Sequence, residues 1–298
     1  MRWTLWIAFA VLCVLAGSSW VIPVEAAEGL PALEQQGVLF AAVGVIAFLF
    51  AGRGLWSRRR EPRWVQLAAG FIGFFGAPMV AAEYARGSVP AISRAALFAM
   101  VPVVVVLSVA AGDSTGREER GARRFLLPAL AGLGGLLLLL PVEFSGSGRG
   151  RVMLGVVCGA VVVAGVASVW LYGLLRDVGF GEAVAIAGLA NALFLLGWSA
   201  ARGEIVWDLS GAASLVSVAS LLDGLELLLL VWLLREMLPI RFASRYLLIP
   251  LLTVLESYVL MRPGWTVRMV CGTILLAAGA GVLLFWKGRE EETMLLLR

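Results

Sequence analysis

Ten long apolar runs dominate this chain and decide what it can fold into. Each run is close in length to the roughly 20 apolar residues that cross the hydrocarbon core of a bilayer as a helix. The crossings must be helical, because no water is present in lipid to bond a bare backbone. The predicted spans are Leu5 to Ile22, Gln36 to Ala51, Val65 to Ala85, Val89 to Ala111, Phe125 to Val142, Val152 to Leu175, Ala183 to Ala201, Ala212 to Leu234, Arg241 to Met261 and Trp265 to Trp286. The sequence therefore predicts an all-α integral membrane protein with ten transmembrane helices.

The composition excludes several other classes. Hydrophobic residues make up 61% of the chain and charged residues 15%, and a soluble core cannot hide such an apolar excess. The basic residues lie mainly between apolar runs, so they predict membrane orientation and not a nucleic-acid partner. Cys13, Cys158 and Cys271 all lie inside apolar runs, and the chain has no histidine. We therefore expect no metal site and no cofactor.

The distribution of positive charge predicts the orientation of the chain. Five basic residues lie in the segments predicted to be outside, namely Arg86, Arg149, Arg151, Arg202 and Arg262. The sixteen in the segments predicted to be inside are Arg2, Arg53, Arg58, Arg59, Arg60, Arg63, Arg117, Arg120, Arg123, Arg124, Arg176, Arg235, Arg241, Lys287, Arg289 and Arg298. Positive residues favour the cytoplasmic side, so the chain is predicted to lie in the inner membrane with both termini in the cytoplasm. An alternative is that the first run is a signal peptide, since Arg2 precedes it and Glu25-Ala26-Ala27 follows it.

The two halves of the chain match in layout. Residues 1–143 and 144–298 each hold five predicted spans, and Pro102 in the fourth span corresponds to Pro250 in the ninth. Each proline also follows a Ser-Arg pair, Ser93-Arg94 in one half and Ser244-Arg245 in the other. Because five is odd, the second half must be inserted upside down. This layout predicts two inverted five-helix repeats, which rock about a central site in many transporters.

Several short motifs give the chain a family resemblance. They are Gly17-Ser18-Ser19-Trp20, Pro90-Ala91, Ala95-Ala96-Leu97, Pro102-Val103, Pro250-Leu251 and the run from Gly272 to Val282. With these the chain resembles the EamA-type drug/metabolite transporters, permeases made of two five-helix repeats. The resemblance implies secondary transport, commonly export, of small metabolites such as amino acids, with a cavity between the repeats. The chain departs from a Leu-Gly-Glu element that the family often carries: Gly112-Asp113 and Met261-Arg262-Pro263 stand in its two places.

Ionisable residues within the spans are the first candidates for a site, since burying them in lipid is costly. Asp223 and Glu226 are three residues apart in the eighth span, hence on one helical face, where they could bind a proton or a cationic group. The alternative is a structural ion pair, because Glu226 and Arg245 of the ninth span lie at similar depths.

Other candidates have structural alternatives as well. Toward the outer face, Glu83 with Arg94 and Glu256 with Arg268 are expected either to pair and seal helices or to line the mouth of an outer gate. Asn191 could bond a neighbouring helix or a ligand. The remaining candidates are the aromatic residues Trp20, Trp170 and Tyr172, of which Trp170 and Tyr172 also fit an interfacial belt. Gly155 and Gly159, and likewise Gly132, Gly134 and Gly135, are expected to be helix-packing surfaces.

The leading functional hypothesis is a secondary transporter, working as an exporter of a small metabolite by alternating access. Its partners are lipid and a small-molecule substrate, and proton coupling and a homodimer both stay open. One alternative is a non-transporting membrane sensor or scaffold. Another is an intramembrane lipid-modifying enzyme, which the lack of histidine and of an HExxH or GxSxG motif disfavours. No GxxxxGK[ST] motif is present for ATP-driven transport, and we expect the chain not to be an enzyme.

Overall fold

A computed structural model describes residues 3–18, 31–57, 63–112, 123–140, 147–206, 218–261 and 266–286. Of residues 52–57, 218, 219 and 261 it describes the main chain alone. The candidate Trp20 lies outside the described residues.

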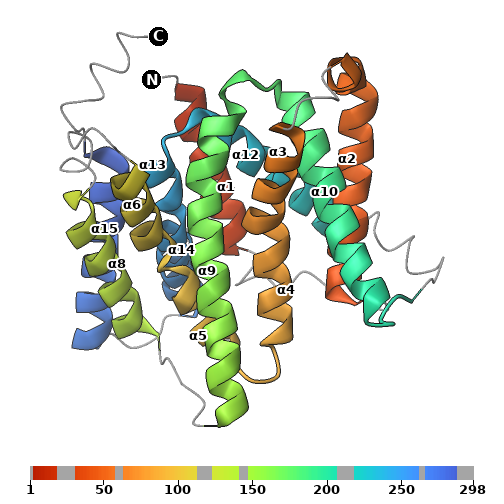
Figure 1. Ribbon diagram of the computed structural model, residues 1–298. Helices are drawn as coiled ribbons and strands as arrows, with labels where there is room; N and C mark the ends of the chain where they lie inside the picture. The colour runs from red at the N-terminus through yellow and green to blue at the C-terminus, as the bar shows by residue number, and fades with distance from the viewer. Residues whose placement is uncertain are drawn as a thin grey trace.

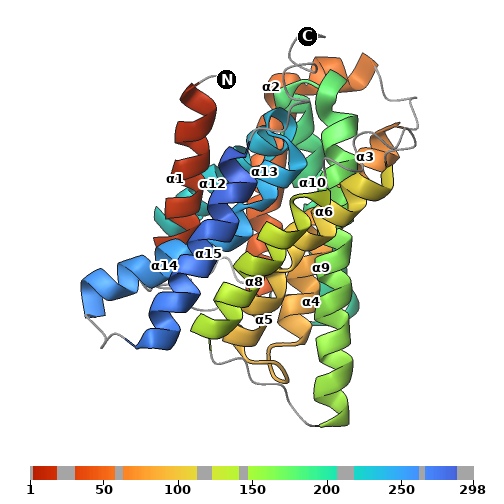
Figure 2. The ribbon, with the colours of Figure 1, turned by 90° about the vertical axis from the view of Figure 1, so that its left-hand side faces the viewer.

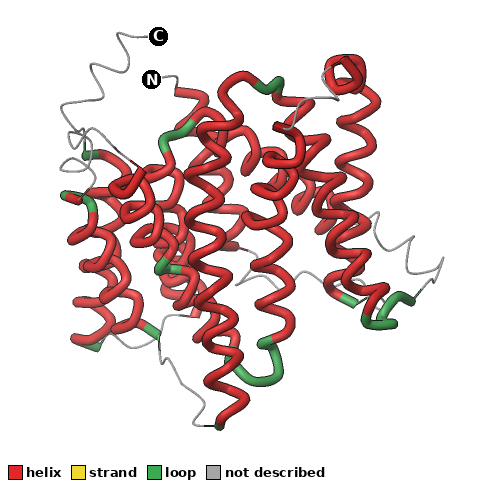
Figure 3. Tube along the Cα trace, in the orientation of Figure 1, coloured by secondary structure: helices red, strands yellow, loops and turns green. Residues whose placement is uncertain are grey.

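All regular structure in the described part of the chain is helical (Figures 1 and 3). Seven spans are single α-helices, and these are α1 (Trp3–Ser18), α2 (Ala32–Ser57), α8 (Leu126–Leu139), α9 (Gly148–Leu174), α10 (Phe180–Ala201), α12 (Val218–Glu236) and α15 (Val267–Phe285). Three spans are interrupted. The third span holds α3 (Arg63–Phe71), the π-helix η1 (Ile72–Gly76) and α4 (Ala77–Tyr84). The fourth span holds α5 (Ala91–Phe98) and α6 (Val101–Gly112). The ninth span holds α13 (Pro239–Ala243) and α14 (Arg245–Met261). A short 3-10 turn, η2 (Leu175–Asp177), follows α9.

These elements make ten helical segments within the described residues, and the prediction of an all-helical chain of ten helices is confirmed. Seven of the spans are long and apolar enough to cross a membrane, while α1 and α8 are shorter apolar helices. The outward faces carry large apolar side chains, among them Phe50, which is 88% exposed. Such a surface is favourable in lipid and costly in water. The chain is therefore a multi-pass membrane protein.

The interrupted spans have local causes. Pro102 has no N–H to bond the carbonyl of Phe98, so the fourth span breaks between α5 and α6. In the ninth span the Oγ of Ser244 donates to the Arg241 carbonyl at 2.6 Å, which stabilises the turn between α13 and α14. The π-helix in the third span turns Phe74 and Phe75 into the interior. Breaks of this kind often lie at functional sites.

Two helix pairs approach so closely that only glycine fits between them. A Cβ at Gly188 of α10 would lie 2.5 Å from the Cα of Gly44 in α2. A Cβ at Gly279 of α15 would lie 2.6 Å from the Cα of Gly132 in α8, and one at Gly135 would lie 2.5 Å from the backbone of α15. Gly132 and Gly135 are thus packing residues, as predicted. The α2–α10 and α8–α15 pairs are the most extensive helix–helix contacts in the described fold.

The GxxxG spacing of the sixth span does not pack as predicted. Gly155 and Gly159 are exposed, and a Cβ at either would meet no atom within 4 Å in the described part of the protein. Both glycines lie on the outward face of α9, together with Val152 and Val156. The small-residue spacing is present, but tertiary packing turns the opposite face of α9 toward the neighbouring helices α3, α4 and α6.

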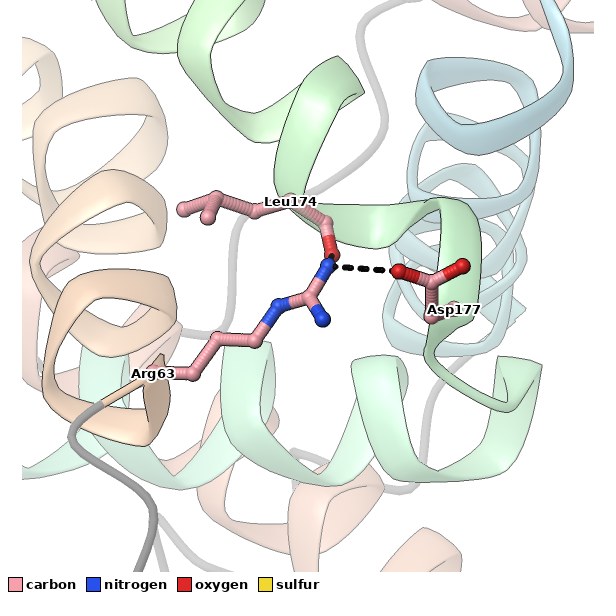
Figure 4. A network of polar contacts seen from close by, with 3 residues as sticks. All are labelled: Arg63, Leu174 and Asp177. Atoms are coloured by element: carbon pink, nitrogen blue, oxygen red, sulfur yellow. Dashed lines mark hydrogen bonds and ion pairs between the residues drawn. The ribbon is translucent and has the colours of Figure 1, made fainter.

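Polar contacts and ring contacts tie the ends of the helices together. Arg63 at the start of α3 donates one nitrogen, Nη2, to the Leu174 carbonyl at 2.8 Å and to Asp177 at 3.1 Å, which holds α3 to the end of α9 (Figure 4). The rings of Trp6 in α1 and Phe285 in α15 stack with centroids 5.6 Å apart. The first residues of α1 and the last residues of α15 therefore lie at the same end of the bundle (Figures 1 and 2).

Candidate functional site

Arg245, the first residue of α14, is only 5% exposed and lies deep among aromatic rings. The carbon at the centre of its guanidinium group lies over the ring of Phe242 at 3.9 Å, over Tyr246 at 4.6 Å and over Phe74 at 5.1 Å from the ring centroids. Phe242 and Tyr246 come from the interrupted ninth span, and Phe74 comes from the π-helix of the third. Ring faces attract a cation and offset part of the cost of removing it from water.

The hydrogen bonds of Arg245 are incomplete. Its Nη2 donates to the Tyr246 hydroxyl at 2.9 Å, while its buried Nη1 has no hydrogen-bond partner among the described residues. Guanidinium carries five N–H donors and accepts none, and a buried donor without a partner costs about 1–3 kcal/mol. The described side chains around Arg245 therefore leave part of its hydrogen-bonding capacity unsatisfied.

The acidic pair of the eighth span lies close by. Glu226 on α12 interacts electrostatically with both Asp223 and Arg245, and Cys13 on α1 is within range of the charges of Glu226 and Arg245. The side chain of Asp223 lies within interaction range of the Gln36 side chain of α2. Glu226 and Arg245 are thus neighbours, as their depths predicted, but among the described residues they form no ion pair within 4 Å. We call Cys13, Phe74, Glu226, Phe242, Arg245 and Tyr246 the Arg245 cluster.

Asn191 is fully buried in the middle of α10. Its Nδ2 donates to the carbonyl of Ala187, one turn earlier, at 2.8 Å, and its Oδ1 has no hydrogen-bond partner in the described structure. A Cβ on Gly76 would lie 2.8 Å from that oxygen, so Asn191 packs against the end of the π-helix that carries Phe74. Its one described hydrogen bond is within its own helix, where interhelical bonding was expected.

The outer charges have partners other than the predicted ones. Glu83 pairs with Arg86 at 2.6 Å, and Nη1 of Arg94 has no hydrogen-bond partner among the described residues. Arg86 is one helical turn from Glu83, so it reaches the carboxylate more easily than Arg94 does from the next helix. The expected pair of Glu83 with Arg94 is wrong, although Arg94 remains within electrostatic range of Glu83.

The expected pair of Glu256 with Arg268 is also wrong. Glu256 accepts a hydrogen bond from the Ser18 hydroxyl of α1 at 3.0 Å, and the Nε of Arg268 donates to the Leu138 carbonyl of α8. The physical reason is the direction in which each helix packs, since α14 lies against α1 and α15 lies against α8. Similar depth in the membrane does not make two side chains face each other.

The aromatic candidates lie apart from the Arg245 cluster. Trp170 is 45% exposed on α9, and Tyr172 on the same helix lies under the guanidinium of Arg176 at 5.2 Å. These positions fit the interfacial alternative better than a ligand site.

A pocket of about 410 Å³ lies elsewhere in the described structure, lined by Tyr84, Gly87, Ser88, Ser147 and Arg149. It sits between the link that joins α4 to α5 and the start of α9, and no residue of the Arg245 cluster lines it. No group of three or more His, Cys, Asp or Glu side chains is placed to hold a metal ion in the described part of the chain.

Sequence reasoning singled out Arg245 and Glu226 but missed four members of the cluster. Phe242 and Tyr246 flank Arg245 at three residues before and one after, so the aromatic residues around a charge within a span could have signalled them. Phe74 and Cys13 come from distant spans, and nothing in the sequence marks them as neighbours of Arg245.

Comparison with known proteins shows a shared fold. No family model and no curated protein matches the chain, whereas sixteen chains among solved structures match it. One of them, described only as a crystal structure of a protein, superposes with a TM-score of 0.69 at 18% sequence identity. The match covers 95% of this chain and 98% of that one. The whole ten-span arrangement therefore has a counterpart among solved structures, and an identity this low carries no information on substrate.

Proposed function

We propose that this chain is a secondary transporter that moves a small organic molecule across the membrane by alternating access between two inverted five-helix repeats. The proposal includes export from the cytoplasm as its direction, the inner membrane as its location and cytoplasmic termini. It agrees with the resemblance to EamA-type permeases and with the loops rich in arginine on one predicted side.

The observation that carries the proposal is the way the ten spans pack. The second span, α2, lies against the seventh, α10, and the fifth, α8, lies against the tenth, α15. The first span packs on the eighth and ninth, while the sixth packs on the third and fourth. Each span of one half can be exchanged for the span at the same place in the other half, so that the first becomes the sixth and the eighth becomes the third. Every contact named above then becomes another of the contacts named above. Two repeats related by a twofold axis would produce this pattern.

Such packing supports a rocking motion. The α2–α10 and α8–α15 crossings each join one helix from each half through glycine, so they can act as fixed contacts between the halves. The Arg245 cluster draws side chains from the first, third, eighth and ninth spans, and so from both halves. A site shared between repeats is the position that alternating access requires.

Flux measurements test the transport proposal. Liposomes with the purified protein, a proton gradient and a panel of labelled amino acids, polyamines and nucleosides should show flux of at least one panel member above empty liposomes. Asp223→Asn and Glu226→Gln should each lower that flux by about tenfold, which corresponds to about 1.4 kcal/mol on the barrier. Arg202→Gln, at an exposed pair with Glu204, is the matched control and should keep wild-type flux. A folded protein that moves no member of the panel in either direction would speak against transport.

Labelling of the termini tests the orientation. Cysteine tags at the N-terminus and the C-terminus should both be protected from a membrane-impermeant maleimide in intact cells and react after permeabilisation. A tag inserted at Gly203, between the seventh and eighth spans, should react in intact cells. Both terminal tags reacting from outside would reverse the proposed orientation, and tags on opposite sides would contradict an even number of crossings.

A further inference from the structure

We propose that Arg245 binds the anionic group of the transported molecule, a carboxylate, and that the nearby charge of Glu226 repels this group. This inference rests on the proposed transport function, and it gives that function a chemical class of substrate. It begins from the one cationic side chain in the described structure that is 95% buried and still has an unfilled donor, Nη1 of Arg245.

The surroundings of Arg245 hold its charge without using up its donors. Phe74, Phe242 and Tyr246 contact the guanidinium through ring faces, and a ring face attracts the cation but is a poor hydrogen-bond acceptor. Only the Tyr246 hydroxyl accepts a described hydrogen bond, from Nη2. The planar fork of guanidinium matches the two oxygens of a carboxylate, which would fill the free position on Nη1.

Glu226 is the resident charge that such a ligand would meet. It attracts Arg245 electrostatically, yet the two side chains form no ion pair within 4 Å among the described residues. The charge of Glu226 thus balances part of the positive charge of Arg245 from a distance. The Nη1 donor of Arg245 can still bond an acceptor that comes into direct contact with it. An incoming carboxylate would gain the contact with Arg245 and would be repelled by Glu226. Removing the charge of Arg245 and removing that of Glu226 should therefore change binding in opposite directions.

Three probes of one shape separate charge from size, namely phenylacetate, its neutral amide phenylacetamide, and the cation phenethylamine. Each is added to the purified full-length protein, and affinity is measured by equilibrium dialysis, with thermal stabilisation as a second readout. We expect phenylacetate to bind and the other two to bind at least about tenfold more weakly, because a charge-assisted hydrogen bond is lost. A wild-type protein that fails to distinguish phenylacetate from phenylacetamide, whether both bind or neither does, overturns the proposal.

Variants then place the binding at Arg245. Arg245→Gln should weaken phenylacetate binding about tenfold or more, since the charge-assisted hydrogen bonds are lost. Glu226→Gln should tighten it about threefold, since a nearby like charge is removed. Arg202→Gln should leave it unchanged. If Arg245→Gln does not fold, Arg245→Lys takes its place and should weaken binding severalfold, because lysine keeps the charge and lacks the planar fork. Unaltered affinity in the Arg245 variant, or weaker binding in Glu226→Gln, contradicts the assignment.

The binding readout keeps this inference separate from the transport proposal. Carboxylate binding that depends on Arg245, in a protein that moves no panel member, would leave the site standing and would contradict transport. Flux that survives Arg245→Gln, together with no preference for phenylacetate, would leave transport standing and would remove the anion site.

Discussion

Replacing Gly188 with leucine is expected to destabilise the folded protein strongly. A Cβ at this position would lie 2.5 Å from the Cα and 2.7 Å from the nitrogen of Gly44, and 2.7 Å from the Phe40 carbonyl. All three atoms belong to the α2 backbone, so relief requires the two helices to separate. Overpacking of this kind costs about 3 kcal/mol or more, which lowers the melting temperature by about 5 °C or more in a chain of this size. Size-exclusion profiles and thermal unfolding of the purified protein in detergent measure the effect.

Gly197 provides the control on the same helix. It is exposed on α10, and a Cβ there would meet no atom within 4 Å in the described structure. Gly197→Leu should therefore fold with wild-type yield, and it gains about 1 kcal/mol of helix propensity. Equal stability of Gly188→Leu and Gly197→Leu would show that α2 and α10 do not approach as closely as described.

Leucine at Gly279 is expected to have an equally large effect at the other crossing. A Cβ on Gly279 would lie 2.6 Å from the Cα and the nitrogen of Gly132 and 2.6 Å from the carbonyl of Pro128, all in the backbone of α8. The neighbouring helix cannot rotate out of the way without losing the contacts of Gly135 with α15. We expect a destabilisation of about 3 kcal/mol or more, seen as aggregated or degraded protein after extraction.

Gly281, two residues further along α15, is the matched control, because a Cβ there meets no atom within 4 Å in the described residues. Gly281→Leu should give protein with a melting temperature at or slightly above that of the wild type, because leucine has the higher helix propensity. A stable, monodisperse Gly279→Leu protein would refute the tight α8–α15 crossing, and with it one of the two fixed contacts in the proposed rocking motion.

The depth of a residue in the membrane could be predicted, but the direction of its side chain could not. Counting residues at about 1.5 Å of rise placed Glu226 near Arg245, and the two are neighbours. The same count for Glu256 and Arg268 failed, since they bond Ser18 and the Leu138 carbonyl instead. Rise along a helix gives height alone, whereas the rotation of each helix depends on what it packs against.

The spacing of glycines in the sequence likewise does not predict which helix face packs against a neighbour. Gly155 and Gly159 have the GxxxG spacing and face outward, while Gly44 and Gly188, which no motif marked, form the closest crossing between α2 and α10. A pair of small residues permits close approach, but it does not create a partner. Whether a small-residue face becomes an interface depends on the shape that the neighbouring helix presents.

The apolar runs alone were enough to predict an all-helical, multi-pass membrane protein, because lipid leaves the backbone no alternative to helices. The placing of Arg245 among Phe74, Phe242 and Tyr246, with Nη1 unfilled, became visible only in the folded chain. That arrangement depends on helix rotation, on the π-helix in the third span and on the break at Ser244. The break at Ser244 has a local cause, but the rotation of each helix is set by contacts between segments far apart in sequence, and local residue patterns carry no record of such contacts.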